Sequence, residues 1–408
     1  MGKLVVLMVT AFVDMVGNLM VLPLLPFVAK SFLGHGPLWT ALNAIGAGGP
    51  GVVVSLLVAM FAVAQLTSAP LWGRFSDRYG RRPALMIGLG SSAIAYVLFA
   101  YANSLELLFL LRIVQGAGGG TVGVIQAYVA DATKPEDRSK ALGWLSAATN
   151  AGVALGPVLG STAAHFSDRG PGLAAAALAS VNMFFAWTYL RESHDTNAVR
   201  AAGKVITKSS VAVRRVVSHW REPASRLIWI YAITIGAFQG MNTILALFLG
   251  SKFGVDKTTI GWFFTYVGVI SIFARALVLG RMVDWLGEPQ LSRVGMVLLA
   301  VGLGTMPLMP SIPWLAVSVA LIPLGTAFTF PCVTGLLSRM VPQHERGLYM
   351  GVQQTFGGAA RSIAPIYAGW SFDHLGHGVP YFTAAGVVLA TISLGIGMEK
   401  HVPAKGVG

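Results

Sequence analysis

The sequence predicts an all-α membrane protein with twelve transmembrane helices arranged as two pseudo-symmetric six-helix bundles. The composition is the first reason: of 408 residues, 55% are hydrophobic and only 11% are charged, whereas a soluble domain carries about 25% charged residues. The second reason is that apolar runs of about 20 residues, long enough to cross the hydrocarbon core as a helix, recur along the chain. The third is a strong asymmetry of Lys and Arg between alternate connections.

Hydropathy and helix breakers divide the chain into two sets of six expected spans. The first run contains Asp14 and is followed by no small-residue cleavage site, so we expect a retained helix rather than a signal peptide. The N-terminal bundle, residues 1–190, is expected to hold spans 4–29, 51–72, 84–102, 106–130, 139–164 and 172–190. The C-terminal bundle, residues 227–400, is expected to hold spans 227–250, 258–280, 291–309, 313–339, 347–369 and 379–398.

The polar stretch 191–226 is the expected cytoplasmic linker, and 401–408 is the expected C-terminal tail. Within the linker, Val211–Trp220 has the pattern of a short amphipathic helix on the inner leaflet. With both termini in the cytoplasm, 22 of the 29 Lys and Arg residues fall in cytoplasmic segments, four in outer loops and three inside spans. This asymmetry predicts a multi-pass protein of the inner membrane. It also explains the net charge of +13 without a nucleic-acid partner.

Two short segments six spans apart resemble each other. Gly73–Gly80 reads G-R-F-S-D-R-Y-G after the second span, and Gly280–Gly287 reads G-R-M-V-D-W-L-G after the eighth. We expect both to be loops. Such a repeat indicates two duplicated bundles with a binding site between them near the bilayer midplane.

Four segments resemble transporters of the major facilitator superfamily. The first repeat, continued through Arg81-Arg82-Pro83, is similar to that family's loop between helices 2 and 3, and Leu111–Gly116 is similar to its R-x-x-Q-G element. Gly152–Gly160 resembles the fifth-helix motif of antiporters, and 13–26 resembles the first helix of twelve-helix drug/proton antiporters, tetracycline exporters among them. The resemblance implies that family's fold and secondary transport by alternating access, with no enzymatic activity.

Asp14 is the only acidic residue in the middle of an expected span. A carboxylate there costs about 2.5–3.5 kcal/mol on insertion scales, so it should face a polar cavity or a partner. It either exchanges a proton for a cationic substrate or remains protonated and bonds a neighbouring helix. Arg112 in the fourth span needs a carboxylate or several carbonyls if it is buried. It either modulates the proton-carrying acid, as the resemblance implies, or forms a structural ion pair.

The resemblance also implies a cytoplasmic gate of arginine–carboxylate pairs that latch the two bundles. Charge at the membrane surface is the alternative, but it does not explain an acid between two glycines. The expected gate residues are Gly73, Asp77, Arg78, Gly80, Arg81, Arg82 and Asp131.

In the fifth span, Gly152, Gly156 and Gly160 recur every four residues beside Pro157, which puts small side chains on one helix face. The alternatives are the antiporter motif and general small-residue packing. Arg361 in the eleventh span either binds an anionic substrate group or neutralises the inner half of the cavity. Other polar and aromatic residues line the cavity or serve packing: Asn18, Gln126, Asn150, Phe238, Gln239, Asn242, Gln353 and Gln354.

We find no phosphate-binding loop and no metal-ligand spacing, so neither a cofactor nor a metal is expected. The single cysteine, Cys332, lies in an apolar run and reads as a core or lipid-facing thiol. The expected partners are a small-molecule substrate, protons and membrane lipid, and the protein is expected to be a monomer.

The preferred function is proton-coupled export of small amphipathic compounds. The alternative is a proton symporter or facilitator that imports a small metabolite or organic anion, and a membrane receptor is a third class. The intramembrane acids and the histidine of tetracycline exporters have no counterparts near Ala95, within 294–309 and near Ser271, which disfavours tetracycline as substrate.

Overall fold

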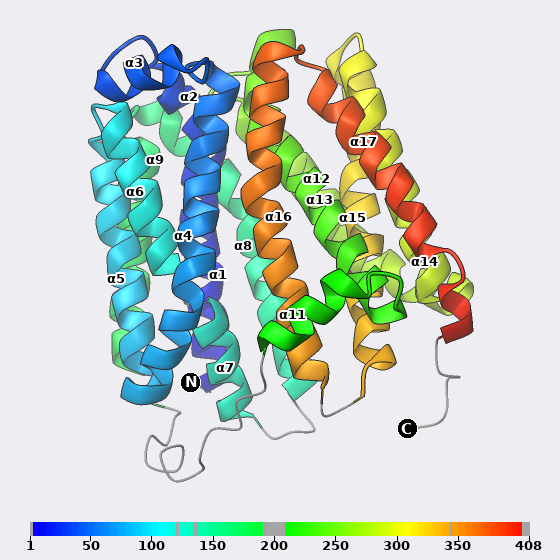
Figure 1. Cartoon of the computed structure of the whole chain (residues 1–408). Coiled ribbons are helices and arrows are strands. Elements are labelled where there is room, and N and C mark those ends of the chain that lie inside the picture. Colours follow the sequence, from blue (N-terminus) through cyan, green and yellow to red (C-terminus); the bar gives the residue numbers. More distant parts are fainter. Residues whose placement is uncertain are drawn as a thin grey trace. The chain divides into compact units, whose positions relative to one another are not determined.

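The computed structural model describes residues 3–119, 122–133, 138–190, 192, 209–342 and 345–401, which form helices and contain no β-strand (Figure 1). Part of the expected linker, residues 191 and 193–208, and the tail residues 402–408 lie outside the described residues. The chain divides into two compact units. Unit 1 is Met1–Lys204 with Leu249–Gly268, and unit 2 is Val205–Phe248 with Val269–Gly408.

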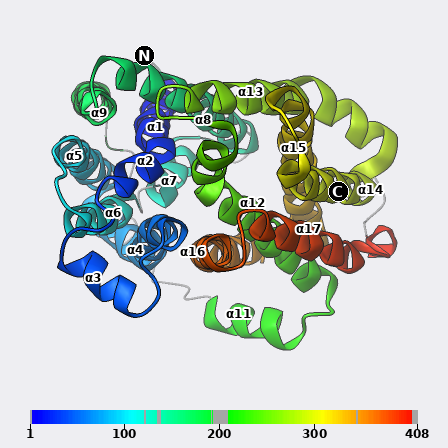
Figure 2. The same cartoon turned by 90° about the horizontal axis from the view of Figure 1, so that it is seen from above.

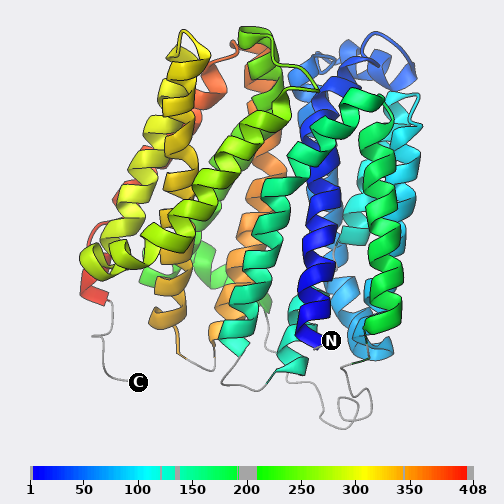
Figure 3. The ribbon, with the colours of Figure 1, turned by 180° about the vertical axis from the view of Figure 1, so that it is seen from behind.

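Unit 1 is built around the helix that carries Asp14. This helix, α1, packs against α8 and α9, while α5 packs against α6 and α9, and α4 against α6. Figure 3 shows the dark blue α1 beside the teal α8. The helices of this unit are α1 (Lys3–Val21), α2 (Leu25–Lys30), α3 (Pro37–Ala44), α4 (Pro50–Tyr79), α5 (Arg81–Ala100), α6 (Leu105–Gly118), α7 (Val122–Ala132), α8 (Arg138–Phe166) and α9 (Gly170–Tyr189).

Unit 2 contains the second set of helices. In it α14 packs against α15 and α17, and α16 contacts α11, α15 and α17 (Figure 2). Its helices are α11 (Ser209–Ser218), α12 (Pro223–Phe253), which ends in unit 1, a π-helical turn (Ala274–Val278), α14 (Leu279–Thr305), α15 (Ile312–Met340), α16 (Arg346–His374) and α17 (Val379–Thr391).

The units differ from the sequence-based halves at Leu249–Gly268, which holds most of α13 (Ile260–Phe273). This segment belongs to unit 1 because α13 packs tightly on α8. A Cβ added to Gly261 would lie 2.6 Å from the Ser161 Cβ, and one added to Gly268 would lie 2.8 Å from the Ala154 Cβ. Glycines on α13 therefore allow the two helices to approach closely.

Nine helical segments of the described chain are long and apolar enough to cross a membrane. One of them, Ile260–Leu308, covers two expected spans. The eleventh expected span is α16, whose glutamines and arginine lower its hydropathy, and the twelfth is the shorter apolar helix Val379–Gly395. All twelve expected spans therefore correspond to helices.

The two repeated segments are helical, so the prediction of loops is wrong. Residues 73–79 form the last turns of α4, and α5 begins directly at Arg81. Only Gly80 leaves the helical conformation between them, with φ 105° and ψ 159°. In the second repeat Gly287, at the equivalent position, has φ 75° and ψ 158° and interrupts α14. Both glycines adopt a conformation that is essentially restricted to glycine, so a one-residue turn replaces each expected loop.

Candidate functional site

Asp14 lies in the middle of α1, and its side chain is half-buried. It takes no part in the ion pairs formed by the described residues. Asn18 follows one turn later on the same helix face and is also half-buried. Close to Asp14, α1 meets α5: a Cβ added to Gly17 would lie 3.4 Å from the Tyr96 ring. The Asp14 carboxylate and the Arg112 guanidinium both interact electrostatically with Tyr96.

The helix that carries Arg112 begins where hydropathy places it. The Ser104 side chain accepts a hydrogen bond of 3.2 Å from the Leu107 N–H and caps α6. Such a cap satisfies one of the free N–H groups at a helix start. Arg112 is therefore about two turns inside α6 rather than at its end.

The Arg112 guanidinium is buried, with 3% of the residue exposed. It donates a 2.6 Å hydrogen bond to Gln115 Oε1 and a 3.4 Å hydrogen bond to the Leu57 carbonyl, and it lies 4.3 Å from the centre of the Phe61 ring. None of these contacts is with a carboxylate. The expected structural ion pair is thus absent among the described residues, and amide oxygen, carbonyl and ring face support the charge instead.

Two residues in this group carried no predicted role. Tyr96 is 3% exposed, and its hydroxyl is hydrogen-bonded to the Gln115 side chain. Gln115 thereby connects Tyr96 to Arg112. The R-x-x-Q spacing contained a signal for Gln115, because residues three apart share a helix face. Nothing in the sequence indicated that Tyr96 would meet them from another helix.

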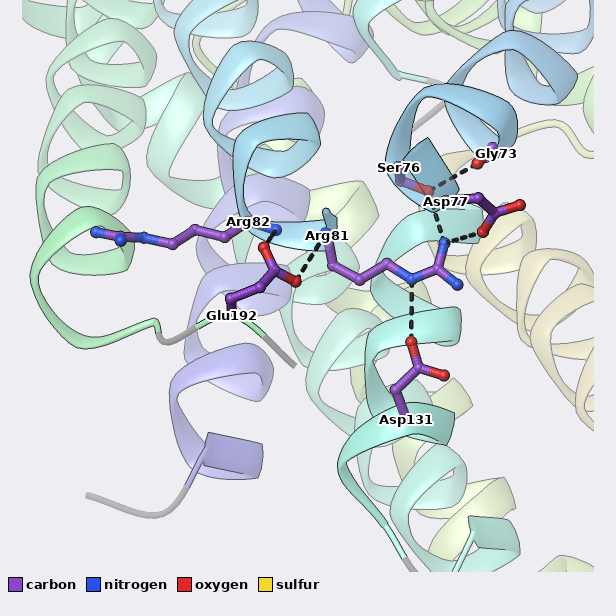
Figure 4. Close-up of polar contacts among 7 residues, drawn as sticks. All are labelled: Gly73, Ser76, Asp77, Arg81, Arg82, Asp131 and Glu192. Atoms are coloured by element: carbon purple, nitrogen blue, oxygen red, sulfur yellow. Dashed lines mark hydrogen bonds and ion pairs between the residues drawn. The ribbon is translucent and has the colours of Figure 1, made fainter. Parts of the chain in front are cut away.

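Arg81 is the centre of a second polar cluster, at the turn between α4 and α5 (Figure 4). It is 8% exposed and pairs with Asp77 at 2.8 Å and with Asp131 of α7 at 3.1 Å. Its Nη1 also donates to the Ser76 hydroxyl at 2.6 Å, and that hydroxyl donates to the Gly73 carbonyl at 2.9 Å. Arg81 therefore joins α4, α5 and α7, all elements of unit 1.

Glu192 completes this cluster, and its role was not predicted. Its carboxylate accepts hydrogen bonds from the backbone N–H groups of Arg81 at 2.9 Å and Arg82 at 3.0 Å, which caps the start of α5 (Figure 4). A negative charge is favourable at a helix N-terminus. The Arg82 side chain donates to the Trp187 carbonyl at 2.6 Å. Arg78, another predicted gate residue, does not join the Arg81 cluster. Its side chain is exposed, and its guanidinium carbon lies 5.3 Å from the centre of the Tyr79 ring.

The glycines of α8 face α1. A Cβ on Gly152 would lie 2.6 Å from the Phe12 carbonyl oxygen, and a Cβ on Gly156 would lie 2.6 Å from the Leu19 Cβ. Gly160 similarly has no room for a Cβ because of the Met20 carbonyl. The helix runs through Pro157, whose carbonyl faces α13 at Gly261. Close packing of α8 against the helix of Asp14 is thus the direct role of this motif.

The predicted cavity residues belong to both units. Gln353 is 0% exposed and accepts a 3.4 Å hydrogen bond from the Thr334 hydroxyl of α15. Arg361 and Gln354 do meet on α16, with Nη2 of the arginine 3.4 Å from the amide oxygen. The others are half-buried or exposed on their helices: Gln126, Asn150, Phe238, Gln239 and Asn242.

The described residues contain no group of three or more His, Cys, Asp or Glu side chains that could hold a metal ion. The Cys332 thiol is buried in an apolar cluster with Leu291 and Phe328.

The chain matches the family model for the Major Facilitator Superfamily over residues 7–365 and 227–401. It is 26% identical over 369 residues to the class B tetracycline resistance protein of Escherichia coli, covering 90% of this chain and 88% of that protein. It is 27% identical over 353 residues to multidrug resistance protein 1 of Bacillus subtilis, covering 86% of this chain and 87% of that protein.

Two solved structures share the fold. The human organic anion transporter MFSD10 aligns with a TM-score of 0.74 and 22% identity, covering 96% of this chain and 98% of its own. The D-xylose-proton symporter aligns with a TM-score of 0.76 and 18% identity, covering 98% of this chain and 97% of its own.

Proposed function

Because the chain belongs to the major facilitator superfamily, we propose that it exports small amphipathic compounds in exchange for protons. It is a multi-pass membrane transporter of small molecules and not an enzyme. The direction of transport and the coupling ion are the parts that this proposal adds.

One observation carries the proposal: Asp14, in the middle of a spanning helix, forms no ion pair with another described residue, and its carboxylate and the buried Arg112 guanidinium both interact electrostatically with Tyr96. An ionisable side chain at this depth is expensive and marks an ion or substrate pathway. Gln115 is hydrogen-bonded to both Tyr96 and Arg112, and Tyr96 interacts electrostatically with Asp14. In this proposal, the charge state of Asp14 affects Arg112 through these two side chains. Proton uptake from the outer side releases a cationic substrate, and proton loss on the inner side lets the next substrate bind.

Export is supported by the relatives and by α8. The relatives are named for resistance to tetracycline and to multiple drugs, a property that an exporter confers. The glycines of α8 hold it against α1, the helix of the proposed coupling acid. In this proposal Asp77, Arg81 and Asp131 stabilise the cytoplasmic end of one bundle in the outward-open state, and their pairs rearrange as the bundles move.

The experiment is transport in proteoliposomes with an imposed pH gradient. We expect a fluorescent organic cation to move against an inward proton gradient, and we expect Asp14→Asn to abolish its gradient-driven movement. Asp168→Asn, which removes an exposed carboxylate of unit 1 that pairs with Lys257, is the matched control and should transport normally. Unchanged gradient-driven flux in Asp14→Asn would remove this residue from the mechanism.

A second candidate is import of an anionic metabolite by symport or facilitation. It is favoured by Arg361, which is half-buried and bonded to Gln354 on α16. The same proteoliposomes separate the two: an inward proton gradient then drives substrate accumulation, and Arg361→Gln raises the KM for anionic substrates.

We also propose that both termini lie in the cytoplasm of an inner-membrane monomer with bundles 1–190 and 227–400. In a Cys332→Ser background, a cysteine at Ser31 should react with an impermeant maleimide added outside intact cells. A cysteine at Ser218 should react only after permeabilisation. The reverse labelling pattern would show that the topology is inverted, with both termini outside the cytoplasm.

A further inference from the structure

Unit 2 contains a long apolar groove between α12, α16 and α17, with a volume of about 800 Å³. Apolar side chains make up almost all of its wall. The Thr383 hydroxyl is already bonded to the Val379 and Pro380 carbonyls at 3.0 and 3.1 Å. The indole N–H of Trp229 is bonded to the Val216 carbonyl, and Tyr367 is the other lining residue with a polar side-chain atom. The groove therefore offers little hydrogen-bonding capacity to a ligand. Representative lining residues are Ile233, Gly240, Phe356, Ala364, Ala384 and Val387.

The groove is elongated and runs along its helices. It extends along α12 from Trp229 to Met241 and along α16 from Phe356 to Ala368, which corresponds to roughly 18 Å at the helical rise per residue. Figure 1 shows α12 behind α16 and α17. Ile363 of α16 is 66% exposed beside the groove. Because these helices span the bilayer, the long axis of the groove follows them through the hydrocarbon region.

The corresponding helices of unit 1 are packed more closely. By the six-span offset, α1 and α8 correspond to α12 and α16. A Cβ on Gly156 of α8 would lie 2.6 Å from the Leu19 Cβ, whereas a Cβ on Gly240 of α12 would meet α16 no closer than 3.2 Å, at the Ala364 carbonyl. At these glycines α8 therefore approaches α1 more closely than α12 approaches α16.

A basic amphipathic helix lies at one end of the groove. Trp229, which lines that end, donates its indole N–H to the Val216 carbonyl of α11 at 3.4 Å. Figure 1 shows α11 crossing the lower part of α16, with which it is in contact. Arg214 on α11 is exposed, and so is Trp220 just beyond it, with 47% of its surface accessible. Exposed arginines beside exposed aromatic side chains are typical of a surface that binds anionic lipid headgroups.

Arg215 of α11 is paired with Glu222, which leaves Arg214 as the arginine of this helix that faces no described carboxylate. We propose that this groove binds one acyl chain of an anionic phospholipid whose phosphate lies against Arg214. The groove supplies the length and apolar wall that a chain needs, and α11 supplies the charge at the end where the headgroup must lie. The bound chain fills the space between α12, α16 and α17 and stabilises unit 2. This inference does not depend on the direction of transport or on proton coupling.

Thermal unfolding of the purified, delipidated protein at fixed detergent tests the proposal. We expect dipalmitoyl phosphatidylglycerol to raise the apparent Tm by about 3 °C or more, because a ligand of the folded state stabilises it. Phosphatidylcholine with the same chains should give less than half of that shift, and glycerol phosphate should give none. Equal shifts from both lipids would overturn the headgroup site, and an equal shift from glycerol phosphate would overturn the chain site.

Variants separate this groove from the rest of the lipid-facing surface. Gly386 lines the groove on α17, and a Cβ there meets nothing within 4 Å, so Gly386→Leu fills the groove without a clash. We expect Gly386→Leu to remove at least two-thirds of the Tm shift that phosphatidylglycerol causes. We expect Arg214→Gln to make the Tm shifts from phosphatidylglycerol and phosphatidylcholine equal. Gly351→Leu on α16 is the matched control, because its Cβ also meets nothing within 4 Å and it lies outside the groove.

An undiminished lipid shift in Gly386→Leu would overturn the proposal. A second outcome would also overturn it: a transported cation, instead of the lipid, raises the Tm of the wild type but not that of Gly386→Leu. The groove would then be a substrate site.

Discussion

Substituting Gly80 by alanine tests the one-residue turn between α4 and α5. At φ 105° and ψ 159°, Gly80 is in a region that is essentially restricted to glycine. Its position is also crowded, because an added Cβ would lie 2.5 Å from the Glu192 carboxylate. The variant must therefore strain the backbone and displace the side chain that caps α5. Gly287 is the natural control: it has a similar conformation, with φ 75° and ψ 158°, but its Cβ would meet only the Pro289 Cδ, at 3.8 Å.

The structure sets the size of the difference. Backbone strain of this kind costs about 1–3 kcal/mol and applies to both alanine variants. Losing a helix cap costs about 1 kcal/mol more and applies only to Gly80→Ala. We therefore expect Gly80→Ala to be less stable than Gly287→Ala by about 1 kcal/mol, a difference in Tm of roughly 2 °C or more.

Thermal unfolding of both variants and of Glu192→Gln gives the measurement. In the Glu192→Gln background, most of the additional cost of Gly80→Ala should disappear, because the cap is already weakened. Equal destabilisation by the two alanine variants, or an excess at Gly80 that survives Glu192→Gln, would refute the assignment of Glu192 as the cap.

Tyr96→Phe keeps the ring but removes the hydroxyl that bonds Gln115. We expect this variant to shift the pH profile of transport and to lower the free energy of unfolding by about 1 kcal/mol. An unchanged pH profile would contradict a role of Tyr96 in proton coupling. Outside the spans, hydrogen bonds from Thr258 and the residue after it hold the pKa of the Asp256 carboxyl at about 2, below its usual 3.8. Because this pKa is lowered in the folded state, its stabilisation is present above about pH 4 and is lost as the pH falls through about 2. The Tm difference between wild type and Asp256→Asn should therefore become smaller as the pH falls from about 4 to about 2. A Tm difference that stays constant over this pH range would show that the ionised Asp256 carboxylate is not the source of the stabilisation.

Much of the fold was predictable because it depends on local composition. Twelve apolar segments had to become helices, since a bilayer offers no other partner for their backbone groups. The repeat around Gly73 and Gly280 was visible in the sequence, but its conformation was not. Charged residues in a short connection suggested a loop, whereas the Asp77–Arg81 pair and a single glycine outside helical geometry make it two helix ends.

The site was predictable only in part. Asp14 and Arg112 stood out because ionisable residues are rare in apolar runs. Their surroundings depended on packing: the buried arginine rests on Gln115, Leu57 and Phe61 rather than on a carboxylate. Gln353 looked like a cavity residue in the sequence, but it is fully buried against α15.

The order of apolar segments, the repeat and the positions of the rare charges follow from the sequence alone, because a bilayer imposes the same helical solution on every such run. Tertiary structure decided which side chains meet. Tyr96 is linked to Arg112 through Gln115, Glu192 caps the start of α5, and α12, α16 and α17 together line a groove. These contacts join residues that lie far apart in the sequence, and the contacts between helices depend on how closely glycines let those helices approach.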